Sequence, residues 1–381
     1  MRQPLKDLAA ICAGQGAPQG DHNYCENGTP FVKAGNLQEL LEGKAITSIQ
    51  KVSDEVAKKH KLRLYPKGTI LFAKSGMSCI KGYIYVLPQS AYVVSHLACI
   101  TPNEDISEYL RYYFNYHKPN QLVKDTAYPS ISLSDVGNLV VDMKPESERN
   151  EIVSVLQHTE SIITLRQQQL QKLDELVKAR FVELFGDGNH PHIALIDLII
   201  EGAGLSYGIV QPGDDGTGDM GVLRPVDMVD GKISTASIKY IDRSIGDGFK
   251  KTELYGDELL ITVRGTTGIT ALTDIRFNGM NVTRGIAVVR YDRNKINPVY
   301  LNAYLNTDES QRYIQEHTRG ATLQQINLSD LRVQQIMVPP LALQEQMAAF
   351  IEQTDKSKSV VQKALDEAQL LFDSLMQQYF G

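Results

Sequence analysis

The side chains that could hold a metal ion are dispersed along the chain. The four cysteines, Cys12, Cys25, Cys79 and Cys99, contain no C-x-x-C pair. A zinc site of Cys12, His22 and Cys25 is conceivable, but no second close pair completes it. Ordinary reduced cysteines are therefore expected.

Motifs of the common enzyme classes are also missing from the sequence. No G-x-x-x-x-G-K-[ST] or H-E-x-x-H occurs. "GAGLSYG" at Gly202–Gly208 lacks the lysine of a phosphate loop, and the acidic run Gly213–Gly221 fits no ordered calcium loop. "VPPL" at Val338 has valine and leucine where an amino-methyltransferase motif needs an amide and a stacking ring. No active site is predicted from these residues.

The chain instead contains one long internal repeat. "ISLSDVGNL" from Ile131 and "INLSDLRVQ" from Ile326 are 195 residues apart, and the same offset relates the two Phe-Gly pairs that begin at Phe185 and Phe380. Two further pairs of segments match with slightly different offsets, which indicates loops of different length. They are "LYPKGTILFAKSG" from Leu64 with "ELYGDELLITVRG" from Glu253, and "SEYLRYYFN" from Ser107 with "PVYLNAYLN" from Pro298.

Each half of the repeat ends in a segment with heptad spacing. Apolar positions alternate in steps of four and three, and a threonine followed by a basic residue interrupts both seams, at Thr159/Arg166 and Thr354/Lys358. This pattern favours two long helices that pair with each other as a coiled coil over helices that each pack on their own domain. The predicted pairing residues are Ile152, Leu156, Ile163, Leu170, Leu173, Val177, Met347, Ile351, Val361, Leu365 and Phe372.

The remainder of each half is rich in glycine, proline and short β-like runs, typical of a mixed α/β domain. The predicted fold class is therefore α+β, with two such domains in tandem and a long helix after each. We expect domains at 1–145 and 188–340, and helices at 146–187 and 341–381. An antiparallel helix pair would give the chain approximate two-fold symmetry.

Charge and hydropathy exclude fewer possible functions than the repeat does. The net charge is −6, yet residues 44–81 carry nine Lys or Arg against two acidic residues. Such a stretch is typical either of a solvated surface or of a nucleic-acid contact. No apolar run approaches the ~20 residues of a membrane span, and the N-terminus does not resemble a secretory signal, so a cytoplasmic protein is expected.

The order of these segments resembles the DNA-specificity subunit of type I restriction–modification enzymes. The residues that carry the resemblance cover nearly the whole chain. They are "TPFVKAGNL" (29–37), "SYGIVQPG" (206–213), "GVLRPVDMVDGKI" (221–233), and the two domain ends "AYPSISLSDVGNLVVDMKPESERNEIVSVL" and "ATLQQINLSDLRVQQIMVPPLALQEQMAAFI".

The resemblance implies a non-catalytic chain in which each globular domain is a target-recognition domain for half of a split, asymmetric DNA site. The paired helices would fix the spacer between the two halves. Two methyltransferase subunits would bind this chain, and two motor-endonuclease subunits would join them in a restriction complex. S-adenosylmethionine, ATP and magnesium would bind to those partners, and no cofactor is expected in this chain.

Base recognition needs side chains with paired hydrogen-bonding groups, and phosphate contacts need cations and small hydroxyls. We expect DNA contacts where such residues occur near the repeated segments, and above all in the loops around Lys74 and Arg264. In the first domain the candidates are Lys33, Asn36, Lys74, Ser75, Ser78, Lys81, Tyr128 and Ser130. In the second they are Arg224, Arg264, Thr266, Thr267, Arg319, Thr322, Gln324 and Gln325.

Two other functions remain open from the sequence. One is a divergent methyltransferase or nuclease whose motifs are unrecognisable, which predicts S-adenosylmethionine binding by the isolated chain. The other is a coiled-coil adaptor with two peptide-binding domains, which predicts no protection of a split DNA site.

Overall fold

A computed structural model describes residues 1–186, 188–216, 218–229 and 231–381. The chain forms two compact units, and each long helix contributes to both. Unit 1 comprises Met1–Gln168 and Gln362–Gly381, and unit 2 comprises Gln169–Val361. Among the residues that the structure describes, no helix combines the length and the apolar character needed to cross a membrane.

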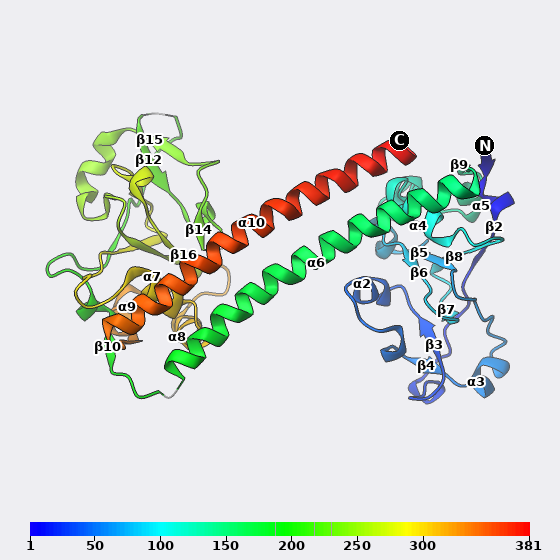
Figure 1. The fold of residues 1–381 in the computed structure, drawn as a ribbon, viewed down its shortest axis with the longest axis horizontal. Helices are drawn as coiled ribbons and strands as arrows, with labels where there is room; N and C mark the ends of the chain where they lie inside the picture. Colours follow the sequence, from blue (N-terminus) through cyan, green and yellow to red (C-terminus); the bar gives the residue numbers. More distant parts are fainter. Residues whose placement is uncertain (187, 217, 230) are drawn as a thin grey trace. The chain divides into compact units, whose positions relative to one another are not determined.

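Unit 1 is built on two small sheets and a terminal strand pair (Figure 1). The four-stranded sheet is antiparallel in the order β2-β8-β5-β6, and the three-stranded sheet has the order β4-β3-β7 with β3 and β7 parallel. Strands β1 and β9 pair near the start of the long helix. The strands are β1 (Arg2–Pro4), β2 (Ala9–Ala13), β3 (Thr29–Val32), β4 (Lys51–Val52), β5 (Ile70–Ala73), β6 (Tyr85–Val86), β7 (Tyr92–Val93), β8 (Leu97–Pro102) and β9 (Val140–Asp142).

Unit 2 repeats this plan except in the fourth strand of the larger sheet, because β19 follows β18 in the chain whereas β6 precedes β7 and β8. Its four-stranded sheet has the order β11-β18-β16-β19, and its three-stranded sheet has the order β15-β12-β17 with β12 and β17 parallel. Strands β10 and β20 pair as β1 and β9 do. The strands are β10 (His192–Ala194), β11 (Ser206–Tyr207), β12 (Met220–Leu223), β13 (Met228–Val229), β14 (Lys232–Ile233), β15 (Lys239–Ile241), β16 (Leu259–Leu272), β17 (Asn281–Val282), β18 (Ile286–Val289), β19 (Gln324–Gln325) and β20 (Gln335–Met337).

Short helices occupy loops in each unit, and the repeated "YL" segments form α4 and α7 as expected. The helices of unit 1 are α1 (Leu5–Leu8), α2 (Asn36–Leu41), α3 (Asp54–Lys59), α4 (Ser107–Tyr116) and α5 (Leu133–Gly137). Those of unit 2 are α7 (Pro298–Leu305), α8 (Asp308–His317) and α9 (Leu328–Val333). The repeated segments "ISLSDVGNL" and "INLSDLRVQ" thus contain the starts of α5 and α9. The predicted α+β class with two tandem domains is confirmed.

The two long helices are α6 (Glu146–Phe185) and α10 (Leu341–Phe380). A proline precedes each helix, and both end with the same backbone bond. Gly186 donates to the carbonyl of Val182 (2.7 Å), and Gly381 donates to that of Gln377 (2.9 Å). The repeated Phe-Gly pair is therefore a helix terminus in both copies. The predicted end of the first helical segment, Asp187, lies outside the described residues, and the four domain boundaries stay a prediction.

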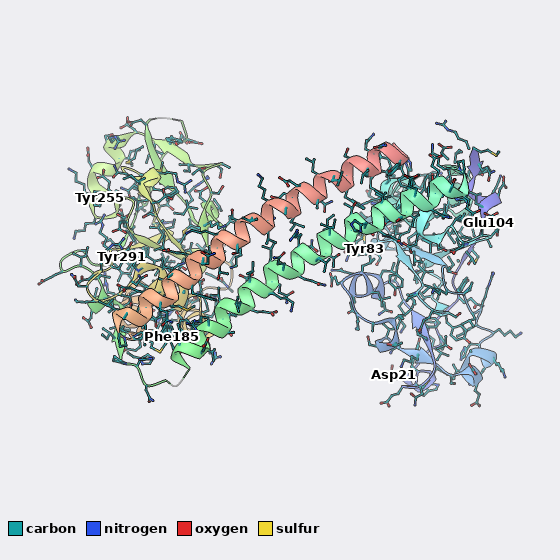
Figure 2. The ribbon with its side chains drawn as sticks, in the orientation of Figure 1. Asp21, Tyr83, Glu104, Phe185, Tyr255 and Tyr291 are labelled. Atoms are coloured by element: carbon teal, nitrogen blue, oxygen red, sulfur yellow. The ribbon has the colours of Figure 1, made fainter. Side chains whose placement is uncertain are left out.

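Contacts between the long helices are antiparallel where they occur inside one unit. In unit 2, Lys358 forms an ion pair with Asp174 (2.5 Å), and the guanidinium of Arg180 lies 5.8 Å from the Phe350 ring centroid. The numbers rise along α6 as they fall along α10. Phe185 at the end of α6 (Figure 2) packs edge-on against Tyr300 of α7.

In unit 1 the apolar positions of the first part of α6 and the last part of α10 belong to one hydrophobic cluster, which contains Ile152, Leu156, Met376 and Phe380. Every predicted pairing residue is buried or half-buried in its helix. The seam threonines are also buried: Thr159 is 4% and Thr354 5% exposed. The burial follows the heptad spacing of each helix, and the pairing of the individual residues stays a prediction.

Candidate nucleic-acid interface

In unit 1 three strand ends meet at one edge, which we call edge 1: Lys33, Lys74–Gly76, Ser95–His96 and Pro129–Ser130. The Val94 amide donates to the carbonyl of Val32 (3.0 Å), which joins the ends of β7 and β3. The Lys74 amide donates to the carbonyl of His96 (2.9 Å). The loop before α5 closes the edge, because the Gly76 amide donates to the carbonyl of Pro129 (3.0 Å). Candidate residues distant in sequence thus share one surface.

Unit 2 has the equivalent edge 2: Arg224, Arg264–Gly265, Arg284–Gly285 and Gln324–Gln325. Three backbone bonds hold it, of which the first two correspond to the bonds at Val94 and Lys74 in edge 1. Thr283 donates to Leu223 (2.9 Å), Val263 donates to Gly285 (2.8 Å), and Ile326 donates to Val263 (3.0 Å).

The hydrogen bonding shows which residues of the two edges occupy equivalent positions. In edge 1, Lys74 accepts from the amide of Ile131 (2.8 Å), as Val263 accepts from Ile326. Lys74 is therefore the counterpart of the buried Val263, and Ser75 is the counterpart of Arg264. The loops around Lys74 and Arg264 are thus equivalent in the two units, with Ser75 at the position of Arg264 itself.

Matched glycines fix the strand beside each edge. A Cβ on Gly14 would overlap the carbonyl oxygen of Val94, and one on Gly208 would overlap that of Val282. Only a residue without a side chain allows the backbone to pass so closely at these points. The next residues, Gln15 and Ile209, then accept hydrogen bonds from the edge turns.

Several candidates in unit 1 form hydrogen bonds within the protein itself. The Lys33 ammonium donates to Gln50 (2.6 Å) and lies 4.6 Å from the Tyr24 ring centroid. Asn36 accepts from the Lys33 amide (2.9 Å), so it forms the turn before α2. Lys81, on the short 3₁₀ helix that also contains Ser78, donates to Gln38 (3.3 Å).

Other candidates in unit 1 remain accessible. The Ser75 hydroxyl forms a hydrogen bond with His96 Nδ1 (2.9 Å). Tyr128, in the loop before Ser130, is 83% exposed. For the Lys74 ammonium, the described residues supply no hydrogen bond or ion pair. Edge 1 thus presents one unpaired lysine together with a serine, a histidine and an exposed tyrosine.

Arg224 in edge 2 differs from the expectation of a DNA contact. Its guanidinium donates twice to Asp227, at 3.0 and 2.8 Å, and Asp227 is fully buried. The hydrogen bonds that Arg224 donates to the Asp227 carboxylate raise the pKa of Arg224. The same guanidinium also donates to the carbonyl of Ser237. Arg224 therefore neutralises a buried carboxylate, which leaves little hydrogen-bonding capacity for DNA.

Thr267 also differs from the expectation. It is 7% exposed, and its hydroxyl shares a hydrogen bond with that of Thr318 (3.0 Å). It stabilises the loop instead of presenting a surface group. Its neighbour Thr266 is exposed.

The loop that closes edge 2 is a tight hairpin. Arg319 and Gln325 exchange two backbone hydrogen bonds, both 2.8 Å, so Thr322 and Gln324 project from its exposed tip. The Arg319 guanidinium lies 3.7 Å from Asp330 but is largely exposed. Arg264 opposes Gln325 across β16 and β19 and is half-buried. Within the described part of the chain its guanidinium has no ion pair or hydrogen bond.

Arg284 was missed by sequence reasoning. It lies in the turn between β17 and β18, is exposed, and its side chain has no partner in the described ranges. Ser95 and His96, which occupy the positions of Arg284 and Gly285 in edge 1, were missed as well. The signal was weak: "YVVSHLACI" from Tyr92 and "NVTRGIAVV" from Asn281 share the 189-residue offset that relates Gly76 to Gly265.

Neither edge contains a metal centre within the described residues, where no three His, Cys, Asp or Glu side chains converge. What the edges offer is a set of fixed backbone turns with cations, hydroxyls and amides. Such groups suit hydrogen bonding to bases and phosphates.

Comparison with known proteins identifies relatives of the whole arrangement. The family model for the type I restriction modification DNA specificity domain matches residues 2–175 and 219–369. The EcoBI specificity subunit of Escherichia coli is 24% identical over 173 residues, which are 45% of this chain and 36% of that protein. The MjaIX specificity subunit of Methanocaldococcus jannaschii is 27% identical over 191 residues, which are 48% of this chain and 43% of that protein. The matches thus span less than half the length of these curated relatives.

Solved structures agree on the fold. The S subunit of the type I restriction-modification system of M. genitalium superposes with a TM-score of 0.62 at 12% identity, over 100% of this chain and 96% of that one. A chain from a structure of type I restriction-modification complex assembly gives 0.60 at 16% identity, over 100% and 97%.

Proposed function

From the premise that this chain belongs to the type I restriction–modification DNA specificity family, we propose that it is the sequence-recognising subunit of such a complex. Each unit binds one half of a split double-stranded DNA site through its edge. The observation that carries the proposal is the pair of equivalent edges, built by the same backbone bonds from different side chains. A shared backbone arrangement with different polar side chains suits two domains that each recognise a different DNA sequence.

The chemistry of the two edges differs in the way this proposal requires. Edge 2 presents two guanidinium groups that have no partner among the described residues, Arg264 and Arg284, beside Gln324 and Gln325. Arginine bonds best to guanine, and glutamine to adenine. Edge 1 presents Lys74, Ser75 and His96 instead. Two different half-sites, and hence an asymmetric target, follow from this difference.

Partner subunits supply the catalysis in this proposal. The long helices carry exposed apolar side chains away from the pairing seam, which single amphipathic helices normally avoid. We assign these positions to docking of two methyltransferase subunits, with motor-endonuclease subunits in a full restriction complex. S-adenosylmethionine, ATP and magnesium bind to those partners, and the assembly works in the cytoplasm. The positions are Leu165, Leu370 and Leu371 in unit 1 and Leu176, Val182 and Val360 in unit 2.

An exchange of recognition units tests the proposal. Residues 188–340 are replaced by the corresponding segment of a relative, and the chain is expressed with its methyltransferase subunits. Methylome sequencing should show one half of the modified site changed and the other preserved. A change in both halves would contradict independent recognition.

Two further measurements test the alternatives. Calorimetry on the isolated chain should detect no S-adenosylmethionine binding, whereas a fused methyltransferase would bind it. Failure of the assembled complex to protect any split DNA site from nuclease digestion would favour a protein adaptor.

A further inference from the structure

Beside each edge lies a short basic segment that the proposed half-site contacts do not use. In unit 1 it consists of Lys58, Lys59, Lys61 and Arg63, and in unit 2 of Lys250 and Lys251. We call these the basic segments. All six side chains are exposed. Within the described ranges, none of them forms a salt bridge.

In unit 1 a single residue connects edge 1 to its basic segment. The Ser95 amide donates to the carbonyl of Gln15 (2.8 Å). The Gln15 side chain then donates to the carbonyl of Lys61 (2.9 Å) and accepts from the amide of Arg63. The segment is therefore held at a fixed place directly beside the edge.

In unit 2 the equivalent strand, β11, links edge 2 to a cavity that its basic segment lines. The Arg284 amide donates to the carbonyl of Ile209 (2.8 Å), just after β11. Residues Ser206 and Tyr207 of β11 line an open cavity of about 710 Å³. Lys250 and Lys251 lie on another wall of this cavity.

The cavity carries a surplus of positive charge. Arg332 of α9 also lines it, with its guanidinium bonded to the carbonyl of Leu205 (3.0 Å), and Asp247 is the acidic residue among its walls. In unit 1 the nearest acids in sequence are Asp54 and Glu55, in the first turn of α3. Both units thus keep a net positive balance beside the edge, in a chain whose overall charge is −6. Concentrated cations of this kind mark the contact surface for a polyanion.

The backbone of Lys61 gives an independent indication of function. Its φ is +51°, the one positive φ of a non-glycine residue in the described part of the chain. It terminates α3, where the Leu62 amide donates to the carbonyl of Ala57 (2.8 Å). Glycine is the residue best suited to this helix terminus. A lysine here is strained relative to glycine, so its charge serves something other than stability.

Resting on the proposed function, we propose that the basic segments bind the phosphodiester backbone of the DNA beside each half-site. Lysine is a flexible point charge without the rigid fork that distinguishes base edges. The segments therefore contribute affinity that does not depend on sequence, while the edges select the bases.

The decisive variant is Lys61→Gly, tested in the full chain assembled with its methyltransferase subunits. Glycine should keep or raise the thermal midpoint, because it relieves the left-handed backbone. DNA affinity should fall nonetheless. The slope of log K against log salt should become shallower by about 0.9 for each phosphate that the variant no longer neutralises. Affinity should decrease equally for specific and non-specific DNA, and the methylated sequence should not change.

Two more variants complete the experiment. Lys250→Ala/Lys251→Ala should produce the same decrease of slope through unit 2. Lys363→Ala is the control, since this exposed lysine of α10 is close to Glu367 (3.9 Å) and lies outside both segments; its slope should equal that of the wild type.

Unchanged salt slopes in both lysine variants would overturn the inference, and so would an altered methylated sequence. If Arg264→Ala still changes the preferred half-site in the same assays, the proposed function stands without the basic segments. If the wild-type assembly itself does not distinguish specific from random DNA, the proposed function fails.

Discussion

At the scale of single residues, the availability of a cation matters more than its presence. Arg224, Arg264 and Arg284 all lie in edge 2, yet only Arg224 has a buried carboxylate partner. A guanidinium committed to such a partner cannot also make a bidentate base contact without leaving Asp227 uncompensated. Arg264 and Arg284 have no such commitment in the described residues.

Arg264→Ala and Arg284→Ala should each relax the half-site bound by unit 2. A bidentate arginine–guanine contact discriminates by about 1–3 kcal/mol, so each substitution should reduce the preference by about 5- to 150-fold. Selection from a library of DNA sites measures this, with Arg312→Ala on the exposed side of α8 as control. An equal decrease on every sequence would identify a phosphate contact instead.

Arg224→Ala should affect stability, not specificity. It leaves the buried Asp227 carboxylate without its cation, at a cost of about 2–4 kcal/mol. Denaturant unfolding should show a lower midpoint, while the folded protein keeps its half-site. Full stability combined with an altered half-site would identify Arg224 as a base contact after all.

At the scale of elements, the long helices combine an apolar seam with two buried threonines. Each hydroxyl donates to the carbonyl four residues earlier in its own helix: Thr159 to Val155 (2.9 Å) and Thr354 to Phe350 (2.8 Å). These bonds satisfy the hydroxyls locally but add nothing across the seam, because those carbonyls already lie within the helical hydrogen-bond pattern.

Thr159→Val and Thr354→Val should therefore stabilise their units, by about 1 kcal/mol each, since a methyl group replaces a buried hydroxyl of equal size. Thr164→Val is a matched control, because its hydroxyl makes the same bond to Glu160 (3.0 Å) on an exposed position. Thermal unfolding should show a rise for the buried pair and almost none for Thr164. A fall at both buried sites would mean that the hydroxyls contribute to pairing.

At the scale of the whole molecule, unit 1 combines two segments that are far apart in the sequence, and unit 2 is the segment between them. Both long helices pass from one unit to the other, with the boundaries at Gln168/Gln169 and Val361/Gln362. We propose that the helices set the spacing between the two half-sites.

Four residues inserted at both boundaries test this, because the contacts inside each unit remain intact. The insertion adds about 6 Å by helical rise and a net rotation of about 40°. One or two base pairs of B-DNA add about 3–7 Å and about 34–70°. Methylome sequencing should show the same half-sites with an unread gap longer by one or two base pairs. An active complex with an unchanged gap would contradict the spacing role.

The sequence by itself determined the features that depend on local periodicity and on the repeat. The heptad positions of α6 and α10 predicted which side chains are buried, because a helical face is fixed by spacing alone. The repeated Leu-Ser-Asp segments and the Phe-Gly pairs predicted equivalent elements in both copies. Family membership followed from the order of these segments.

Only the tertiary structure decided which polar residues are available. The Arg224–Asp227 pair and the burial of Thr267 depend on hydrogen bonds between residues whose spacing no periodic pattern fixes. Arg284 became a candidate because the end of β17 lies beside the ends of β12 and β16. Lys61 became one because its backbone is left-handed. These properties arise when strands distant in sequence meet at one edge, so composition and spacing could not reveal them.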